Sequence, residues 1–308
     1  MNPRISICLP TYNGARDLAR LLPVLAAQEL DGGSAGLKSG AVEICAIDSS
    51  SGDESVALLR AAGAQVEVIP KSEFRHGATR NRIAARARGE ILLFLSQDAL
   101  PQGKDFLSAL TAPFVDPRTA GVSARVLPHP EDDPLTRRTA LAQPEAGSSP
   151  ESFDLDGVAG LWTLPEAARL RLLVINDVAS AVRADVFRKI PFPDVEFGED
   201  VAWAARALTA GWRLRFAPGA VVHHAHCYTP SQAFARYRVD ARFRRRVLGH
   251  MIRPSLLSVA RGITYEVRED LRYLGRCGGP GKFSAVLRSP ILRSAQVLGQ
   301  YSGARAPR

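Results

Sequence analysis

The chain has 308 residues, of which 46% are hydrophobic and 23% charged, the ordinary balance of a soluble globular protein. It contains no run of eighteen or more uncharged apolar residues, which argues against a membrane-spanning helix, and its N-terminus lacks the apolar core and cleavage site of a secretion signal. Four scattered cysteines without a CxxC spacing predict a reduced cytosolic protein that has no structural zinc site.

The net charge of +9 is concentrated at one end of the chain. Residues 229–308 hold 16 Lys and Arg against 4 Asp and Glu, whereas residues 1–228 are slightly acidic. A basic segment of this kind indicates an anionic partner, which could be a membrane surface, a phosphorylated acceptor or nucleic acid. We therefore expect a domain over 1–228 and a basic helical C-terminal extension over 229–308.

Strands and helices alternate through the first hundred residues. Four apolar runs predict strands, over 4–9, 41–47, 65–69 and 90–95. Three stretches between them predict helices, over 15–30, 54–62 and 77–88. Residues 32–40 are rich in glycine and serine and predict a flexible loop. The alternation is typical of βαβ units, and hence of an α/β protein with a mainly parallel sheet flanked by helices.

The composition changes beyond residue 128. Residues 128–165 are rich in proline, serine and acidic residues, and they predict a long loop of the lid or binding type. A strand that runs into a helical turn is predicted over 177–187, a helix over 198–212 and two short strands over 213–226. Past residue 230 the chain is predicted to be helical and basic.

Polar residues follow three of the predicted strands. The first strand leads into "PTYNG", the second ends at Asp48 in "DSSSGD", and the fourth is followed by Ser96, Gln97 and Asp98. Because ligands of open α/β sheets bind beyond the carboxyl ends of the strands, Asp48 and Asp98 should share one sheet edge. Each acid alone could cap a turn or a helix, but the two together favour a ligand site.

Four segments, in this order, resemble the glycosyltransferase family 2 enzymes of GT-A fold. They read "ISICLPTYNG", "AIDSSSGDES", "FRHGATRNRIAARARGEILLFLSQDALP" and "FGEDVAWAARALTAGWRLRFAPGAVVHHAHCY", and the third looks most like the rhamnosyltransferase branch. The resemblance covers roughly residues 4–250. It implies a Rossmann-like sheet and inverting transfer of a sugar, with rhamnose favoured, from a nucleotide-sugar donor to a glycan or polyprenyl-linked acceptor. The oligomeric state is not indicated.

The resemblance assigns residues that bind the nucleoside of the donor. Asp48 matches the position that accepts the ring N–H of the base, for which a carboxylate is a suitable acceptor. The loop along the nucleoside matches Pro10, Thr11, Tyr12 and Asn13. Two alternatives stay open, namely that Asp48 is a turn cap and that Tyr12 is only a surface aromatic.

Further donor contacts are implied around the diphosphate. Gln97 lies in the motif after the fourth strand, and Arg75, His76 and Arg80 are cations that could approach the phosphates. Gly77 permits a tight turn into a helix whose N-terminal amides favour anions. The alternative is an ordinary helix start with Arg80 on a solvated face.

The family holds a divalent cation with a DxD motif, which here reads Ser96-Gln97-Asp98. The first acid is thus a serine, whereas Asp98, at the position of the usual direct ligand, is retained. His226 is the first choice for completing the metal shell and His224 the second. Oxygen ligands suit Mg²⁺ or Mn²⁺, a Lewis acid for the leaving diphosphate. The alternatives are that Asp98 merely starts a loop, or that zinc binds.

The "GED" segment matches the family motif whose aspartate is the catalytic base, so Asp200 is the expected base and Glu199 its neighbour at the acceptor or loop. Asn176 and Asp177 fall where such enzymes line the acceptor pocket, and Trp203, at helical spacing (i, i+3) from Asp200, is expected to flank the acceptor. The alternatives are that both acids only complement a helix N-terminus and that Trp203 belongs to the core.

The basic extension indicates peripheral attachment to an anionic membrane through residues 234–293, on the inner face of the cytoplasmic membrane of an otherwise cytoplasmic protein. A non-catalytic nucleotide-sugar or glycan-binding protein of the same fold is the main alternative, suggested by Ser96 and opposed by Asp98 and Asp200. A nucleic-acid-binding module rests on basicity alone and lacks a recognition motif, so no nucleic-acid partner is expected.

Overall fold

The computed structural model describes residues 3–30, 33–34, 37–277 and 281–306. The chain divides into two compact units, one of residues 1–127 and 144–224, and one of residues 128–143 and 225–308. The second unit thus contains, besides the basic C-terminal part, a segment that was expected to be loop. Residues 32, 35 and 36 of the predicted loop over 32–40 lie outside the described residues, while its residues 37–39 form a 3-10 turn.

One mixed sheet forms the centre of the first unit, in the strand order β5-β4-β1-β6-β10-β8-β11-β7, with β9 paired to β11. Neighbours among β5, β4, β1 and β6 run parallel, and β10 runs antiparallel to β6 and β8. The strands are β1 (Ile5–Thr11), β4 (Val42–Asp48), β5 (Gln65–Val68), β6 (Ile91–Leu95), β7 (Leu100–Pro101), β8 (Thr119–Leu127), β9 (Glu151–Phe153), β10 (Ala179–Arg183) and β11 (Arg213–His223). The four strands predicted in the first hundred residues are confirmed, and β2 (Glu29–Leu30) pairs antiparallel with β3 (Gly33–Ser34).

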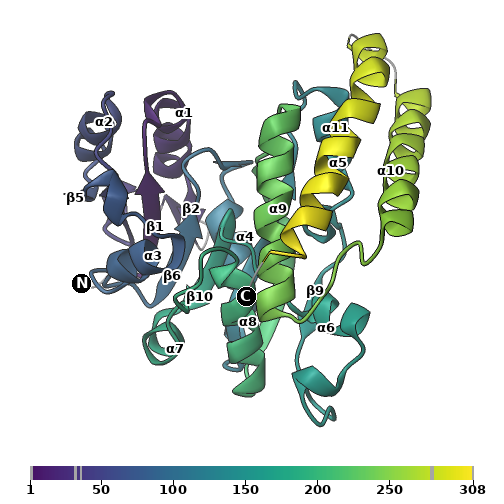
Figure 1. Ribbon diagram of the computed structural model, residues 1–308. Coiled ribbons are helices and arrows are strands. Elements are labelled where there is room, and N and C mark those ends of the chain that lie inside the picture. The colour runs from purple at the N-terminus through teal and green to yellow at the C-terminus, as the bar shows by residue number, and fades with distance from the viewer. Residues whose placement is uncertain (1–2, 31–32, 35–36, 278–280, 307–308) are drawn as a thin grey trace. The chain divides into compact units, whose positions relative to one another are not determined.

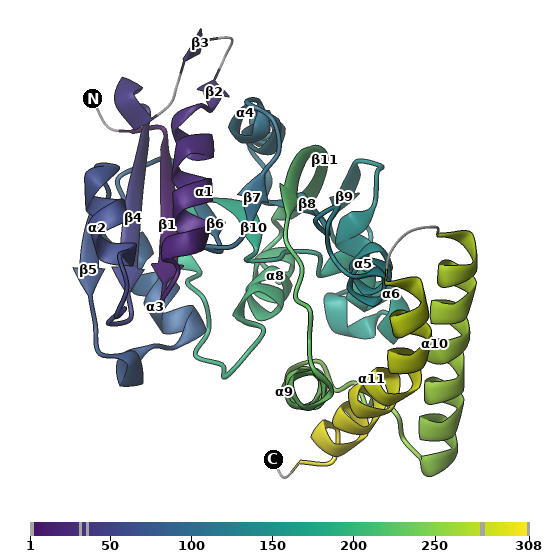
Figure 2. The same cartoon turned by 90° about the horizontal axis from the view of Figure 1, so that it is seen from above.

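Helices cover both sides of this sheet (Figures 1 and 2). The apolar residues of α1 (Ala15–Ala26), α2 (Ser55–Ala61) and α4 (Phe106–Thr111) pack into one cluster with alternate residues of β1 and β6. On the other side lie α3 (His76–Ala84), α7 (Ala184–Lys189) and α8 (Glu199–Thr209). This layered arrangement is the α/β architecture that the alternating pattern predicted.

Strand β6 is buried on both faces, which explains its unbroken apolar run. Leu93 and Leu95 belong to the cluster on the α1 side. Phe94 points the other way, with its ring centroid 5.1 Å from that of Phe187 and 4.9 Å from that of Phe192. The strand therefore fixes the position of the polar residues that follow it.

The second unit is helical, as predicted for the chain past residue 230. It contains α9 (Pro230–Val247), α10 (Leu256–Arg276) and α11 (Lys282–Gly303), with α11 between the other two (Figure 1). Its fourth helix, α5 (Pro134–Leu141), corrects the predicted loop over 128–165. The Asp133 side chain accepts hydrogen bonds from Leu135 N and Thr136 N, and Pro134 occupies the first turn, so the start signal was present in the sequence.

Within the segment 213–226, residues 213–223 form one long strand, β11, instead of the two predicted. Its pairing with β8 shifts register between Ala217 and Val221, where Pro218 and Gly219 interrupt the ladder without ending the strand. Among the described residues, no helix is both long enough and apolar enough to cross a membrane.

Candidate functional site

Three loops of the first unit meet at the carboxyl ends of β1, β4 and β6. Strands β1 and β4 pair in register, with Pro10 opposite Ile47 and Thr11 opposite Asp48. The buried Asp48 carboxylate accepts hydrogen bonds from Thr11 Oγ1 (3.0 Å), Ser51 Oγ (2.6 Å) and Ser51 N (2.8 Å). Asp48 therefore anchors the turn, in agreement with the alternative that it is a turn cap. Oδ1 accepts only one of these three bonds, and a carboxylate oxygen can accept two, so contact with a base stays a prediction.

Gln97 joins the loop after β6 to the loop after β1. Tyr12 N donates to Gln97 Oε1 (2.9 Å), and Gln97 Nε2 donates to Tyr12 O (3.2 Å). A Cβ at Gly14 would lie 2.5 Å from Gln97 Oε1, so glycine allows this approach. Asn13 Oδ1 accepts a hydrogen bond from Gly52 N (2.9 Å), which ties in the loop after β4. The predicted nucleoside residues are thus brought together.

Lys71 is a residue of this region that the sequence analysis missed. Its Nζ donates to the Tyr12 hydroxyl (2.9 Å) and lies 4.1 Å from the centroid of the Tyr12 ring. Tyr12 remains 38% exposed, so its ring is partly open to a ligand. Lys71 follows Pro70 after β5, a strand of the same parallel set, and that position is the signal that could have indicated it.

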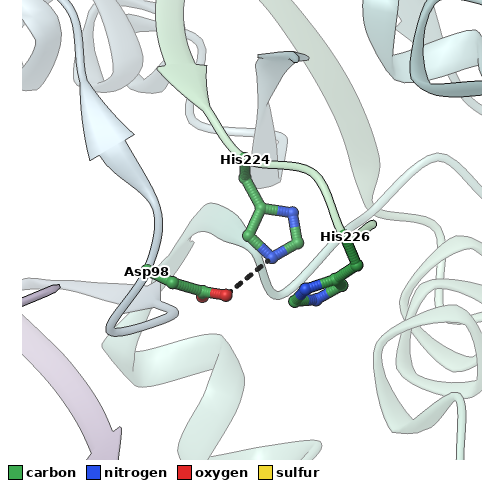
Figure 3. Close-up of side chains that lie close together, drawn as sticks. All are labelled: Asp98, His224 and His226. Atoms are coloured by element: carbon green, nitrogen blue, oxygen red, sulfur yellow. Dashed lines mark ion pairs between the residues drawn. The ribbon is translucent and has the colours of Figure 1, made fainter. Parts of the chain in front are cut away.

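Asp98 and His224 face each other in the first unit (Figure 3). Asp98 Oδ2 lies 3.4 Å from His224 Nε2. His224 is held by the sheet, because its backbone N donates to Leu127 O (2.8 Å) just beyond the β8–β11 ladder. His226 follows two residues along the chain, and one possible ligand atom from each of the three residues lies within 4.8 Å of the others. One carboxylate and two imidazoles are a donor set that could hold a divalent cation.

Ser96, where the family pattern has an acid, faces a backbone carbonyl. Ser96 N donates to Val178 O (3.0 Å), and Ser96 Oγ lies 3.5 Å from Asp177 O. A hydroxyl can donate to a carbonyl oxygen, whereas a carboxylate at this place would meet it with a second acceptor. The structure thus gives a local reason for the serine, and it links the turn of Asp98 to Asp177.

Three acids and one arginine form a cluster next to this turn. Arg80 Nη1 lies 2.9 Å from Glu199 Oε1, and Arg80 Nε lies 3.4 Å from Asp177 Oδ2. Asp177 N donates to Asp200 Oδ2 (3.2 Å). Arg80, Asp177 and Glu199 are 6%, 5% and 4% exposed, so the solvated-face alternative for Arg80 does not hold. The predicted contacts of these residues with donor and acceptor stay predictions.

Burial and mutual repulsion raise the pKa of two carboxyl groups in this cluster. Burial, followed by the negative charge of Glu199, raises the pKa of Asp200 to about 6. The pKa of Asp177 lies well above its usual value, chiefly because of burial, and the Arg80 charge only partly offsets this. Asp200 keeps some solvent exposure at the first turn of α8. A carboxylate with a pKa near neutrality is suited to act as a general base.

Glu199 and the start of α3 approach closely because residue 77 has no side chain. A Cβ at Gly77 would lie 3.0 Å from Pro193 O and 3.3 Å from Glu199 Cβ. The prediction that Gly77 permits a tight turn is wrong. Gly77 lies inside α3, where the lack of a side chain permits close packing. His76, exposed at the start of α3, packs edge-on against Phe74 at 5.0 Å, and Arg75 forms an exposed ion pair with Asp194 at 3.4 Å.

Trp203 and Asn176, both expected at the acceptor pocket, make contacts that hold neighbouring segments of the fold in place. Trp203 is completely buried, and its Nε1 donates to Ile190 O (2.7 Å), so the structure favours the core alternative. Asn176 is half-buried; its Nδ2 donates to Glu145 Oε1 (3.4 Å) and its Oδ1 accepts a hydrogen bond from Val178 N (2.9 Å). Asn176 therefore braces the segment before β10.

A Rossmann-like sheet whose carboxyl edge gathers these loops and acids has the architecture of a GT-A type transferase. Solved structures agree with this class. The mannosyltransferase PcManGT from Pyrobaculum calidifontis, solved in complex with GDP-Man and Mn²⁺, aligns with 99% of this chain and 86% of its own length, with a TM-score of 0.58 and 17% identity. The expected fold class is thereby confirmed.

A family model described as glycosyl transferase family 2 matches residues 6–163, which is half of the chain. The chain therefore belongs to glycosyltransferase family 2 and is a glycosyltransferase, as the sequence motifs predicted.

Two curated relatives confirm the similarity to rhamnosyltransferases. The O-antigen chain rhamnosyltransferase RfbN of Salmonella typhimurium is 28% identical over 240 residues, which are 76% of this chain and 70% of the relative. The O-antigen chain rhamnosyltransferase WbaN of Salmonella anatum is 31% identical over 204 residues, 63% of this chain and 60% of the relative.

We expect Arg80→Met to lower the free energy of unfolding by about 3–5 kcal/mol at pH 8, because it leaves ionised acids buried without their cation. The loss should shrink toward pH 5. Asp177 and Asp200 have raised pKa values and take up protons as the pH falls, so fewer buried charges then need a partner. Urea unfolding at both pH values measures the difference.

Arg75→Met is the matched control, because its ion pair with Asp194 is exposed and should contribute little at either pH. An equal loss of stability at pH 5 and pH 8 for Arg80→Met would contradict the assignment of Arg80 as the charge partner of this cluster.

Proposed function

We propose that the protein transfers a sugar, with inversion and with rhamnose as the favoured sugar, from a nucleotide-diphosphate donor to a hydroxyl of a glycan or lipid-linked acceptor. One observation carries the proposal: a chain of contacts joins the turn of Asp98 to Asp200. Ser96 of that turn meets Asp177 O, and Asp177 N donates to Asp200. The relatives named O-antigen chain rhamnosyltransferases support the choice of sugar and of a glycan acceptor.

The proposed reaction is a single displacement. Asp200 takes the proton of the acceptor hydroxyl, and the acceptor oxygen forms a bond to the anomeric carbon. The bond from that carbon to the donor phosphate oxygen breaks at the same time, and its electron pair leaves with the nucleoside diphosphate. Attack opposite to the leaving group inverts the anomeric centre, and no covalent enzyme intermediate forms. Burial, followed by the negative charge of Glu199, keeps the pKa of Asp200 near neutrality, and the charge of Arg80 offsets part of this rise.

A divalent cation, Mg²⁺ or Mn²⁺, fits the residues at the Asp98 turn. Asp98 would supply an oxygen ligand, and His224 and His226 would supply ring nitrogens. Imidazole nitrogen is a poorer ligand for Mg²⁺ than for Mn²⁺, and the PcManGT complex contains Mn²⁺. When bound, such a cation would act as a Lewis acid and neutralise charge on the leaving diphosphate.

We expect Asp98→Ala and His224→Ala each to weaken Mn²⁺-dependent binding of a nucleoside diphosphate at least about tenfold, because each removes a ligand atom. Calorimetry with dTDP, UDP and GDP, with and without Mn²⁺, measures this. His223→Ala is the matched control, since the neighbouring histidine lies outside the cluster and should leave binding unchanged. Failure of the unaltered protein to bind any of the three nucleotides would overturn the proposed function.

We expect kcat/KM for sugar transfer to fall about tenfold per pH unit below pH 6, because a general base with a pKa of about 6 must be ionised to accept a proton. Asp200→Asn should lower kcat by about 10²–10⁴-fold and leave nucleotide binding intact. A pH–rate profile and a panel of nucleotide sugars test both statements.

Asp194→Asn, which alters an exposed acid that precedes α8, should keep both the rate and the profile. An acid limb that persists unchanged in Asp200→Asn would assign the base to another group.

We further propose that the protein attaches peripherally to an anionic membrane, at the inner face of the cytoplasmic membrane, through exposed faces of α10 and α11. Phe283, Leu287, Ile291 and Leu298 are 44–78% exposed, and their spacing places them on one side of α11. On α10, exposed Leu256, Leu257, Tyr265 and Leu271 alternate with the exposed side chains of Arg261, Arg268 and Arg272. Apolar side chains among arginines suit a membrane interface, which combines apolar acyl chains with anionic headgroups.

Flotation with vesicles that contain phosphatidylglycerol tests the attachment. The protein should float with these vesicles at low salt and less at high salt, and Leu287→Asp with Ile291→Asp should abolish flotation. Val115→Asp, at a residue that is 90% exposed in the first unit, is the control. Flotation that is absent, or equal in all three proteins, would remove the proposal.

A further inference from the structure

His226, a candidate ligand of the divalent cation, lies in a segment that has no regular secondary structure (Figure 3). Strand β11 ends at His223, and α9 begins at Pro230. Residues 224–229 between them belong to neither element. A metal site tolerates deviations of only about 0.2 Å in its ligand distances. The position of the His226 ring therefore depends on contacts outside the two neighbouring elements.

The side chain of the next residue ties this segment to the start of α5. Cys227 Sγ donates to Asp133 Oδ2 over 3.1 Å. Asp133 is itself held in place, because its carboxylate caps α5 and accepts hydrogen bonds from Leu135 N (3.0 Å) and Thr136 N (3.5 Å). A thiol is a weak donor, but a carboxylate is the strongest kind of acceptor it can meet. The thiol thus attaches the backbone beside His226 to a capped helix.

Helix α5 is anchored in turn by α10 and α11 of the same unit (Figure 1). Leu135, in the first turn of α5, is completely buried in a cluster with Leu274 of α10 and Ala285 of α11. Arg288 of α11 lies 4.0 Å from Asp133 Oδ1, so α11 also approaches the cap itself. The helix start that receives the thiol therefore belongs to a packed core.

A buried ion pair links the same three helices. Arg293 of α11 and Asp270 of α10 are 2% and 0% exposed, and Arg293 Nε lies 2.8 Å from Asp270 Oδ2. Arg293 also donates to Thr139 Oγ1 of α5 (2.9 Å). Next to Thr139 on α5, Arg138 pairs with Glu266 of α10. Because breaking a buried pair leaves an uncompensated charge, these contacts strongly favour one arrangement of the three helices.

We propose that Cys227 is a positioning residue for the cation site, and that the packing of α5 against α10 and α11 supports it. A chain of contacts runs from these helices through Asp133 and Cys227 to His226. The thiol donates its hydrogen to the carboxylate, so its role is to fix the neighbouring imidazole and not to bind the cation itself. The inference rests on the proposed function, because it requires His226 to be a ligand.

Titration of the full-length protein with Mn²⁺ tests the inference, with the electron paramagnetic resonance signal of free Mn²⁺ as the readout. Cys227→Ala, which removes the donor, should weaken Mn²⁺ binding about tenfold, as the loss of a group that supports a metal ligand does. Cys227→Ser keeps a donor at the same place and should restore the affinity to within about twofold. Cys277→Ala alters a half-buried cysteine at the end of α10, and as the matched control it should leave Mn²⁺ binding unchanged.

A double variant separates positioning from a general effect on the fold. In a His226→Ala background, Cys227→Ala should cause no further loss of Mn²⁺ affinity, because the thiol acts through that imidazole. A further loss in this background, or a serine variant as weak as the alanine variant, would overturn the inference. Equal Mn²⁺ binding by the unaltered protein and Cys227→Ala would overturn it as well, and would leave the cation site intact. An unaltered protein that binds no Mn²⁺ would overturn the cation site of the proposed function itself.

Discussion

The three loops that carry Tyr12, Asp48 and Asp98 depend on the parallel pairing of β1, β4 and β6, because parallel neighbours must end at the same edge of the sheet. Burial of β6 on both faces fixes where its polar end emerges. The loops then lie close enough for single side chains, those of Thr11, Ser51 and Gln97, to join them by hydrogen bonds. The core of the first unit thus positions the loops of the candidate site.

The cluster around Arg80 links the stability of the fold to the proposed role of Asp200 as general base. Arg80 makes it possible to bury Asp177 and Glu199, but its charge does not offset the burial of Asp200 and the negative charge of Glu199, which raise the pKa of Asp200 to about 6. A second cation in the cluster would stabilise the fold. It would also lower the pKa of Asp200 and so make Asp200 a weaker base. One cation for three acids is therefore a compromise that suits a general base at neutral pH.

Sequence periodicity predicted the strands and the shared edge, because apolar runs and strand order are local properties. It could not predict that Arg80 is buried, since its partner Glu199 lies 119 residues away and the pairing depends on the close approach at Gly77. The spacing of Trp203 along its helix is the same whether it flanks the acceptor or belongs to the core. Only the packing of β8 against α8 assigns it to the core. The polar composition around residues 134–141 predicts a loop, whereas the local Asp133-Pro134 start signal determines the helix.

Ser96 changes the charge balance that a cation at Asp98 would experience. With serine in place of the usual acid, the three candidate ligands contribute one negative charge, because neutral histidines ligate metals. A divalent cation would keep a net positive charge until an anionic ligand joined it. The donor diphosphate is such a ligand, so cation and nucleotide should bind together, each with higher affinity in the presence of the other. A carboxylate at residue 96 would reduce this coupling, and it would face the carbonyl oxygen of Asp177 as a second acceptor.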